Sequence, residues 1–278
     1  MNLKDLSNIE RSQNSTARMP VLFFGHGSPM NAIEDNEFVR EWEKVGVALP
    51  KPKAILCISA HWETKGTRIT AVERPETIHD FGGFPSELYE VQYPAPGSPE
   101  LARETKKIVS KTDVTIEEKW GLDHGAWSVI KHLYPKADVP VLEMSLDYNQ
   151  TPLYHYELAK ELALLRRKGI LIIGSGNIVH NLAHVDWNHL NEPDYGFDWA
   201  IEANTGIKEL ITSGDHKKLL HYSALGKAYK LAVPTPEHFL PLLYVLALQE
   251  KDEEPQFFND KAVGGSLTMT CVKISDSL

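Results

Sequence analysis

Cysteine and long apolar runs are both scarce in this sequence. Only two of the 278 residues are cysteines, Cys57 and Cys271, which is too few for a disulfide framework and is typical of a reducing compartment. No apolar stretch approaches the roughly 20 residues needed to span a bilayer. Residues 1–18 are polar and lack the apolar core of a signal peptide. We therefore expect a cytoplasmic protein with no membrane partner.

Positive charge is also in short supply. The chain has 29 basic against 38 acidic residues and a formal net charge of -9. Nucleic acids and anionic membranes are bound through basic surfaces, so this balance argues against either partner. A small molecule is the expected partner, and the sequence indicates nothing about the oligomeric state.

Several signatures of common enzyme classes are absent. There is no Gly-x-Ser-x-Gly elbow, and Cys57 lies inside an apolar run, which argues against a serine or cysteine nucleophile. The sequence has no phosphate-binding Gly-x-x-x-x-Gly-Lys-Ser/Thr loop and no His-Glu-x-x-His pair of zinc proteases. Nucleotide binding and that protease arrangement therefore have no support.

Strand-like and helix-like segments alternate along the chain. Apolar runs predict strands at 20–24, 53–59, 139–145, 170–174 and 266–274, with an outer strand at 67–72. Periodicity and capping residues predict helices at 34–47, 99–110, 125–134, 153–168, 197–213 and 237–249. This alternation is typical of a single α/β domain whose mainly parallel or mixed sheet is covered on both faces. We expect this domain to comprise residues 19–278, after a flexible tail at 1–18.

Four histidines occupy related positions in this pattern. His26 and His61 each follow an apolar run, and His180 follows another after a turn that contains glycine. His238 comes after a short segment rich in proline near the other end of the chain. An isolated histidine is usually a turn or core residue, but ligands gather at the carboxyl ends of parallel strands, and imidazole suits zinc and iron. Together the four predict a metal site.

The remaining histidines are less distinctive. His124 precedes a predicted helix, where backbone N–H groups favour anionic ligands, although Asp123 could be the helix cap and His124 a bystander. We assign seven others to the surface: His79, His132, His155, His184, His189, His216 and His221. His184 is the reserve candidate, because it would share a helical face with His180 if that segment were helical.

Five segments together resemble the class III extradiol aromatic-ring dioxygenases, in the branch of DOPA 4,5-dioxygenase type. They are Phe-Gly-His-Gly-Ser-Pro at 24–29, Ser-Ala-His-Trp at 59–62, Gly-Leu-Asp-His-Gly-Ala-Trp at 121–127, Gly-Ser-Gly-Asn-Ile-Val-His-Asn-Leu at 174–182, and Pro-Thr-Pro-Glu-His-Phe at 234–239. They extend from residue 20 to about 245, which is nearly the whole chain without the tail. The combination is specific, whereas any single segment would not be.

The resemblance implies a three-layer α/β/α fold and an enzyme that opens a catechol such as L-DOPA with O2 to a muconate semialdehyde. It implies one mononuclear divalent metal held by His26, His61 and His238, with Fe(II) for turnover and Zn(II) plausible as the bound ion. His180 would be an acid/base catalyst or a further ligand, and His124 would contact substrate or dioxygen and donate a hydrogen bond to developing charge. The expected substrate contacts are Ser28, Asn177 and Phe84, with the aromatic segment 81–93 as a lid.

Three alternatives remain open at this stage. Glu237, beside His238, could be the third ligand, as in the iron sites that use two histidines and a carboxylate. Three histidines are also a ligand set of catalytic zinc, so a zinc-dependent hydrolase fits the same residues. The third alternative is a relative that binds a ligand without catalysis.

Overall fold

The central sheet has six strands, and a computed structural model describes it within residues 18–190, 192 and 194–276. The strand order is β6-β2-β8-β1-β12-β9. β6 (Val141–Glu143), β2 (Ala54–Ser59), β8 (Ile170–Gly176) and β1 (Val21–Gly25) are parallel neighbours, whereas β12 (Cys271–Asp276) and β9 (Glu253–Phe258) continue the sheet antiparallel. The sheet is therefore mixed, with a parallel half that carries the strand-end histidines.

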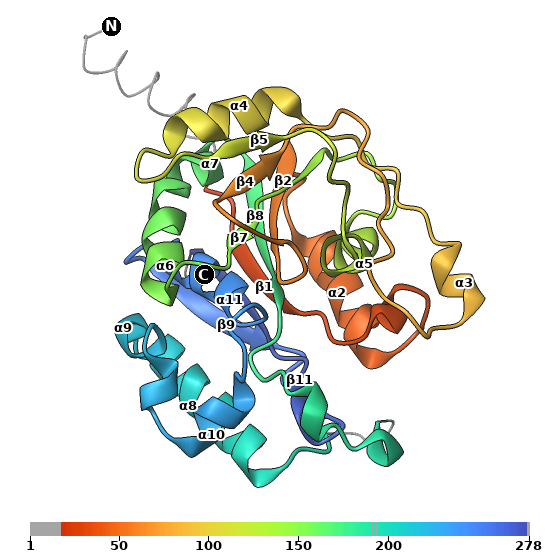
Figure 1. The fold of residues 1–278 in the computed structure, drawn as a ribbon, viewed down its shortest axis with the longest axis vertical. Coiled ribbons are helices and arrows are strands. Elements are labelled where there is room, and N and C mark those ends of the chain that lie inside the picture. Colours follow the sequence, from red (N-terminus) through yellow and green to blue (C-terminus); the bar gives the residue numbers. More distant parts are fainter. Residues whose placement is uncertain (1–17, 191, 193, 277–278) are drawn as a thin grey trace, which may run out of the picture.

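Helices cover both faces of this sheet. On one face lie α6 (Pro152–Glu161), α8 (Asp198–Thr212) and α11 (Leu240–Ala247); on the other lie α2 (Glu37–Ala48) and α5 (His124–Leu133) (Figure 1). Alternate residues of β1 enter the two cores, with Val21 and Phe23 in one and Leu22 and Phe24 in the other. This alternation follows from the two-residue period of a strand. The expected three-layer α/β/α fold is confirmed.

The remaining elements are short. The small strands are paired as β3 (Glu63–Thr64) with β7 (Leu146–Asp147), β4 (Arg68–Thr70) with β5 (Thr115–Glu117), and β10 (Ala262–Val263) with β11 (Leu267–Thr268). The other helices are η1 (Pro29–Ala32), α3 (Ser86–Tyr89), α4 (Pro99–Ile108), α7 (Ala163–Arg167), η2 (Leu182–His184), η3 (Trp187–His189), α9 (His216–Leu219), η4 (Tyr222–Ala224) and α10 (Lys227–Ala232). Among the described residues, none of the helices has the length and apolar character needed to cross a membrane.

The expected elements recur with a few differences. The helix expected at 153–168 is divided into α6 and α7 at Leu162, and the strand expected at 266–274 is divided into β11 and β12. Edge strand β9 was not expected, because it contains charged residues and Pro255 instead of an apolar run. Proline is tolerated there since an edge strand leaves N–H groups unpaired.

Two of the histidines assigned to the surface are buried, so that assignment is wrong for them. His155 is 0% exposed and its Nδ1 lies 3.1 Å from the hydroxyl of Tyr244, in the contact between α6 and α11. His216 is also buried, with Nδ1 3.2 Å from the Tyr156 hydroxyl. His184 is exposed and shares no helical face with His180, because the helical turn begins only at Leu182.

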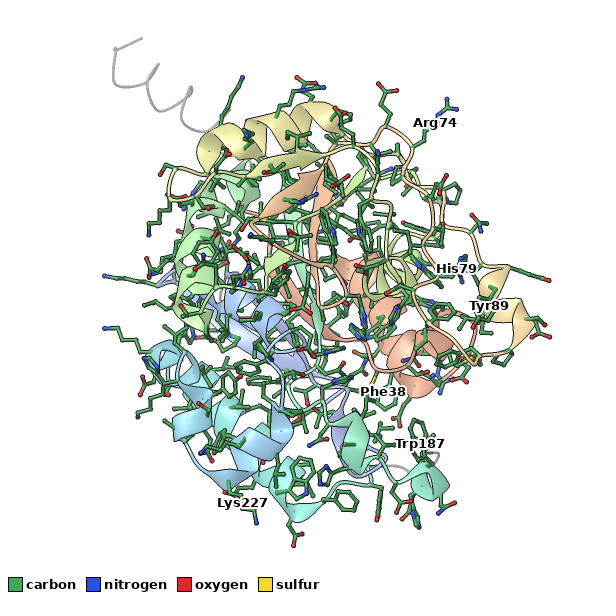
Figure 2. The ribbon with its side chains drawn as sticks, in the orientation of Figure 1. Phe38, Arg74, His79, Tyr89, Trp187 and Lys227 are labelled. Carbon is green, nitrogen blue, oxygen red and sulfur yellow. The ribbon has the colours of Figure 1, made fainter. Side chains whose placement is uncertain are left out.

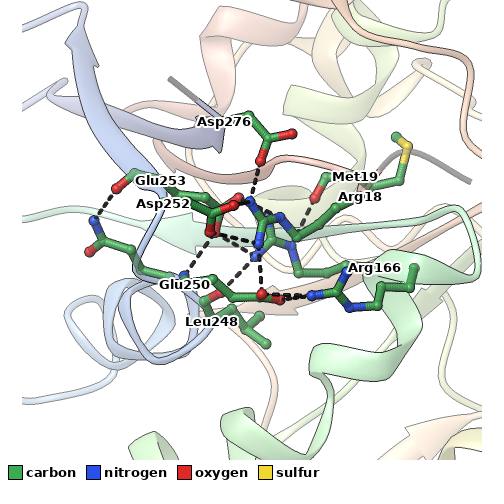
Figure 3. Close-up of polar contacts among 10 residues, drawn as sticks. Arg18, Met19, Arg166, Leu248, Glu250, Asp252, Glu253 and Asp276 are labelled. Atoms are coloured by element: carbon green, nitrogen blue, oxygen red, sulfur yellow. Dashed lines mark hydrogen bonds and ion pairs between the residues drawn. The ribbon is translucent and has the colours of Figure 1, made fainter. Parts of the chain in front are cut away.

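A buried ionic cluster holds the start of the described chain. Residues 1–17 of the expected tail lie outside the described residues, but Arg18 belongs to the fold: its side chain is 6% exposed and pairs with Glu250 and Glu253 (Figure 3). Arg166, also buried, contacts both oxygens of Glu253 and donates to the carbonyl of Met19 at 2.8 Å. Arg18, which the sequence analysis placed in the tail, is therefore part of the folded structure.

Candidate metal centre

The site lies at the carboxyl edge of the parallel strands. β1, β2 and β8 end at one level, because Ser59 pairs with Ser175 and Gly25 with Gly176. His26 follows β1 directly and its backbone N–H donates to the Gly176 carbonyl at 2.9 Å. His61 follows β2 by two residues. The two predicted strand-end histidines are thereby placed side by side.

Two serines at the strand ends hold the first turn of α5 against this edge. The Ser59 hydroxyl donates to Oδ1 of Asp123 at 2.7 Å, and the Ser175 hydroxyl donates to the Gly125 carbonyl at 2.5 Å. Asp123 is the N-cap of α5, since Oδ1 also accepts the Ala126 N–H at 3.1 Å. His124 is the first residue of the helix and lies in the site. Asp123 is therefore the helix cap, and His124, next to it, is a residue of the site.

His238 reaches the same edge through a close backbone contact. The Asn177 N–H donates to the His238 carbonyl at 2.9 Å, just beyond the end of β8. A Cβ atom on Gly176 would lie only 2.1 Å from that carbonyl oxygen. Glycine is therefore required at this position for the segment that carries His238 to approach the sheet.

Three imidazoles form a first group, His26, His61 and His124. Each offers a ring nitrogen within 4.8 Å of those of the other two, and Nε2 of His26 lies 3.2 Å from Nε2 of His61. The rings of His61 and His124 have centroids 3.9 Å apart. His26 and His124 are buried, whereas the His61 side chain is 21% exposed, so the group is open on the side of His61.

A second group contains His180, Glu237 and His238, again with one ligand atom of each within 4.8 Å of the others. The rings of His180 and His238 are stacked, with centroids 3.5 Å apart. The ring centroid of His238 lies 5.4 Å from that of His26 and 5.0 Å from that of His61. The ligand set predicted from sequence, His26, His61 and His238, therefore spans the two groups.

Hydrogen bonds at Nδ1 orient two of the predicted ligands. Nδ1 of His26 lies 2.9 Å from the Ser175 hydroxyl, and Nδ1 of His238 lies 3.0 Å from Oε1 of Glu237. Such a contact at one ring nitrogen determines which nitrogen remains for a metal. In both residues Nε2 is the nitrogen left available.

The electrostatics of the site favour neutral imidazoles. Burial, reinforced by the neighbouring histidines, lowers the pKa of His26 and of His61. Burial, followed by the effect of His238, lowers the pKa of His180 to about 3. Burial also lowers the pKa of His238, although the hydrogen bond with Glu237 opposes it. Because a metal binds the neutral ring, these converging nitrogens fit a divalent cation.

Asp80 is a site residue that the sequence reasoning missed. Its Oδ2 lies 2.9 Å from Nδ1 of His124 and 3.7 Å from Nδ1 of His61. Burial opposes its ionisation, but the hydrogen bonds from His124 lower the pKa of Asp80 overall. The only signal in the sequence was its position immediately before the aromatic segment 81–93.

Glu143, at the end of β6, was missed as well. It is fully buried, and its Oε1 accepts the Asp123 N–H at 2.9 Å. Burial, followed by the nearby Asp123 carboxylate, raises the pKa of Glu143 well above its usual value. This buried acid supports the turn before His124, behind the histidines. A glutamate that ends an apolar strand was its signal.

The three expected substrate contacts differ in their surroundings. Ser28 is exposed, and its hydroxyl accepts the Met30 N–H at 3.2 Å at the start of η1. Asn177 is buried and donates to the Thr268 carbonyl at 2.8 Å, while its Oδ1 has no hydrogen-bond partner within the described parts of the chain. Phe84 is half-buried. Their proposed contact with substrate stays a prediction.

An aromatic loop borders the histidines. The ring centroid of Phe81 lies 5.5 Å from that of His124 and 5.4 Å from that of Phe84. Phe81 therefore lies between Phe84 and the histidines. The ring centroids of His79, on the loop, and Tyr89, the last residue of α3, lie 6.1 Å apart (Figure 2). Gly82 and Gly83 lie between Phe81 and Phe84 and have open space around them. The loop presents aromatic faces beside His124.

Comparisons with known proteins agree with this geometry. A 4,5-DOPA dioxygenase extradiol of Escherichia coli K12 is 45% identical over 264 residues, covering 94% of this chain and 96% of that protein. The 4,5-DOPA dioxygenase extradiol of Beta vulgaris is 35% identical over 264 residues, covering 92% and 96%. A crystal structure of an uncharacterized protein from Escherichia coli K12 matches with a TM-score of 0.80 at 40% identity, covering 92% of this chain and 99% of that one.

The family itself is matched over most of the chain. Residues 20–270 correspond to the family described as the catalytic LigB subunit of aromatic ring-opening dioxygenase. This range includes all five histidines of the site and the whole parallel half of the sheet. The resemblance noted in the sequence is thus confirmed, and the chain belongs to the LigB family of aromatic ring-opening dioxygenases.

Proposed function

We propose that this extradiol ring-opening dioxygenase acts on a catechol such as L-DOPA, cleaving the 4,5 bond to give a muconate semialdehyde. The convergence of His26, His61, His124, His180 and His238 at one sheet edge is the observation that carries the proposal. The relatives from Escherichia coli and Beta vulgaris are named 4,5-DOPA dioxygenases, which supports L-DOPA as a substrate. Both atoms of O2 enter the product, so no external reductant is needed.

A single divalent metal is held, in this proposal, by His26, His61 and His238. Support comes from Nδ1 of His26 and of His238, each engaged by a neighbour so that Nε2 remains free. Glu237 then acts as the hydrogen-bond partner of His238 instead of a ligand. Fe(II) in this position supplies the redox chemistry that lets dioxygen react with a catechol, and Zn(II) is the competing ion because three neutral imidazoles also suit zinc.

His180 and His124 handle protons and charge in the proposed reaction. Burial, followed by the effect of His238, lowers the pKa of His180, so its neutral ring offers a nitrogen lone pair, either to a metal as a further ligand or to the proton of a catechol hydroxyl. His124 presents Nε2 to the site, since Nδ1 is engaged by Asp80. It donates from Nε2 to developing negative charge when the ring carries both protons, and the Asp80 carboxylate is the partner that such a ring needs.

Substrate is expected to lie against the aromatic loop. The faces of Phe81 and Phe84 suit a flat ring, and Ser28 and Asn177 flank the histidine-bearing segments. The expected partners are a small aromatic diol and O2. A cytoplasmic location is part of the same proposal and is supported by two free, buried cysteines.

Oxygen uptake tests the proposal. The protein is purified anaerobically, loaded with Fe(II) and given L-DOPA or simple catechols while a yellow semialdehyde is followed by absorbance. Stoichiometric oxygen consumption with that chromophore is expected for L-DOPA, and the zinc-loaded protein serves as control. Bound iron without oxygen uptake on any catechol would contradict the proposal and favour zinc-dependent hydrolysis or a ligand-binding relative.

A further inference from the structure

We infer that Asp80 is a positioning residue for His124: its carboxylate determines which imidazole nitrogen faces the metal centre. The inference deepens the proposed function and rests on it, because the orientation of His124 affects turnover only if the histidine site is catalytic. It assigns a role to a residue on the aromatic loop, outside the segments that carry the metal ligands.

The two carboxylate oxygens of Asp80 make different contacts. Oδ1 accepts the backbone N–H of His124 at 2.9 Å, and Oδ2 lies 2.9 Å from Nδ1 of the same residue. Oδ2 is also 3.7 Å from Nδ1 of His61. One side chain therefore contacts His124 through both its backbone and its ring, and borders a second imidazole of the site.

Asp80 is held in this position by the chain before it. The Ile78 N–H donates to the Leu122 carbonyl at 2.7 Å, and the indole N–H of Trp127 donates to the Ile78 carbonyl at 2.8 Å. Both bonds are made by Ile78, two residues before Asp80. They join the loop to residues on either side of His124. The contact with His124 is thus set by anchored backbone on each side.

The chemistry of the contact fixes the imidazole tautomer. An ionised carboxylate only accepts hydrogen bonds, so Nδ1 of His124 must carry the proton that is donated to Oδ2. The other nitrogen, Nε2, is then unprotonated in the neutral ring and belongs to the group formed with His26 and His61. In the proposed reaction Nε2 of His124 must take up a proton before it can donate to developing charge, and that uptake needs this tautomer.

The competing explanation is that Asp80 only caps α5. Asp123 already caps the helix by accepting the Ala126 N–H. Asp80→Asn separates the two roles, because its amide oxygen can still accept the His124 backbone N–H. Its amide nitrogen is a donor in place of Oδ2, so the ring must reverse its tautomer and place the proton on Nε2.

The first test reads the tautomer in the metal-free protein. Long-range ¹⁵N–¹H spectra of the histidines, with His124 assigned from the His124→Gln variant, distinguish a proton on Nδ1 from one on Nε2. We expect the Nδ1–H form in the parent and the Nε2–H form in Asp80→Asn. This readout requires neither metal nor substrate.

The second test reads turnover of the Fe(II)-loaded protein per bound iron. Loss of an orienting partner typically lowers activity about 10- to 100-fold, and we expect this loss in kcat for Asp80→Asn with KM for the catechol little changed. Asp80→Asn combined with His124→Gln should be no slower than His124→Gln alone, because Asp80 acts through His124.

Asp186 supplies a matched control. Its Oδ2 lies 2.8 Å from Nδ1 of His189, which reproduces the ring contact outside the site, and its Oδ1 accepts the N–H of the preceding residue, Asn188, at 3.1 Å. Asp186→Asn should change the His189 tautomer and leave kcat unchanged.

An unchanged His124 tautomer in Asp80→Asn, or an unchanged kcat in an active enzyme, would overturn the inference. A parent protein that consumes no oxygen with any catechol would instead overturn the proposed function, and the positioning role in turnover with it. The spectra would still show whether Asp80 sets the tautomer, so the two failures are distinguishable.

Discussion

The Nε2 atoms of His26 and His61 lie 3.2 Å apart, although the residues are separated by 35 positions in the sequence. The parallel pairing of β1 and β2 with β8 between them brings both strand ends to one edge. At this distance the two nitrogens share a proton as a hydrogen bond or, when both are unprotonated, can share a cation. This pair is the core of the metal centre that we propose.

Removal of one of these rings should abolish metal binding. His26→Ala deletes the buried member of the pair, and we expect less than stoichiometric Fe(II) or Zn(II) after reconstitution, measured by elemental analysis. His184→Ala, at an exposed histidine outside the site, should retain full occupancy. Full metal occupancy in His26→Ala would mean that the ligands lie elsewhere.

A methyl group at Gly176 should separate His238 from the sheet edge. The added Cβ would lie 2.1 Å from the His238 carbonyl oxygen, so the backbone must move. We expect Gly176→Ala to be destabilised by about 1–3 kcal/mol, as for overpacking elsewhere, and to bind metal more weakly.

Urea denaturation and metal titration measure both effects of Gly176→Ala. Gly82→Ala is the control, because a Cβ there meets nothing within 4 Å. Equal stability and equal metal affinity in the two variants would show that the contact between Gly176 and His238 is not required.

Buried His155 should make the fold sensitive to acid. Burial lowers its pKa from 6.5 to about 4 in the folded protein, so the unfolded chain binds more protons between these values. Stability therefore falls as pH falls through this window, by about 2 kcal/mol from this residue between pH 7 and pH 5.

His155→Gln keeps a polar partner for the Tyr244 hydroxyl but cannot titrate. Urea denaturation measures the loss of stability between pH 7 and pH 5. This loss should be smaller in His155→Gln than in the parent by about 2 kcal/mol. His221→Gln, at an exposed histidine, should follow the parent. Parallel pH profiles for the parent and His155→Gln would contradict the prediction.

The buried pair of Arg166 and Glu253 should be sensitive to loss of one charge. Both side chains are at most 1% exposed. Glu253→Gln leaves a guanidinium without its counter-charge, and breaking such a pair typically destabilises a protein by about 3–5 kcal/mol. Thermal and urea unfolding measure the change.

The exposed pair of Lys44 and Glu41 provides the comparison, with side chains 73% and 37% exposed. Glu41→Gln should change stability by less than about 1 kcal/mol, since water screens the pair. A similar small effect of Glu253→Gln would show that the remaining carboxylates of the cluster compensate fully.

Local sequence signals were sufficient for much of the fold. Apolar runs at β1, β2 and β8 predicted buried strands because a strand covered on both faces has no polar side. Capping residues Ser98 and Asp123 each accept a backbone N–H at a helix start, as expected from their type. Edge strand β9 was missed, because one-sided pairing tolerates charged residues and proline.

Local periodicity was enough to show that several histidines follow buried strands, and therefore to place them at one sheet edge. Tertiary structure alone decided that His124 joins His26 and His61, that His180 stacks on His238, and that Asp80 and Glu143 support them. Strand order and register depend on pairing between segments far apart in the sequence, which local periodicity does not encode. The same limit explains His155, whose burial depends on α11 packing against its helix and on no residue near it in the chain.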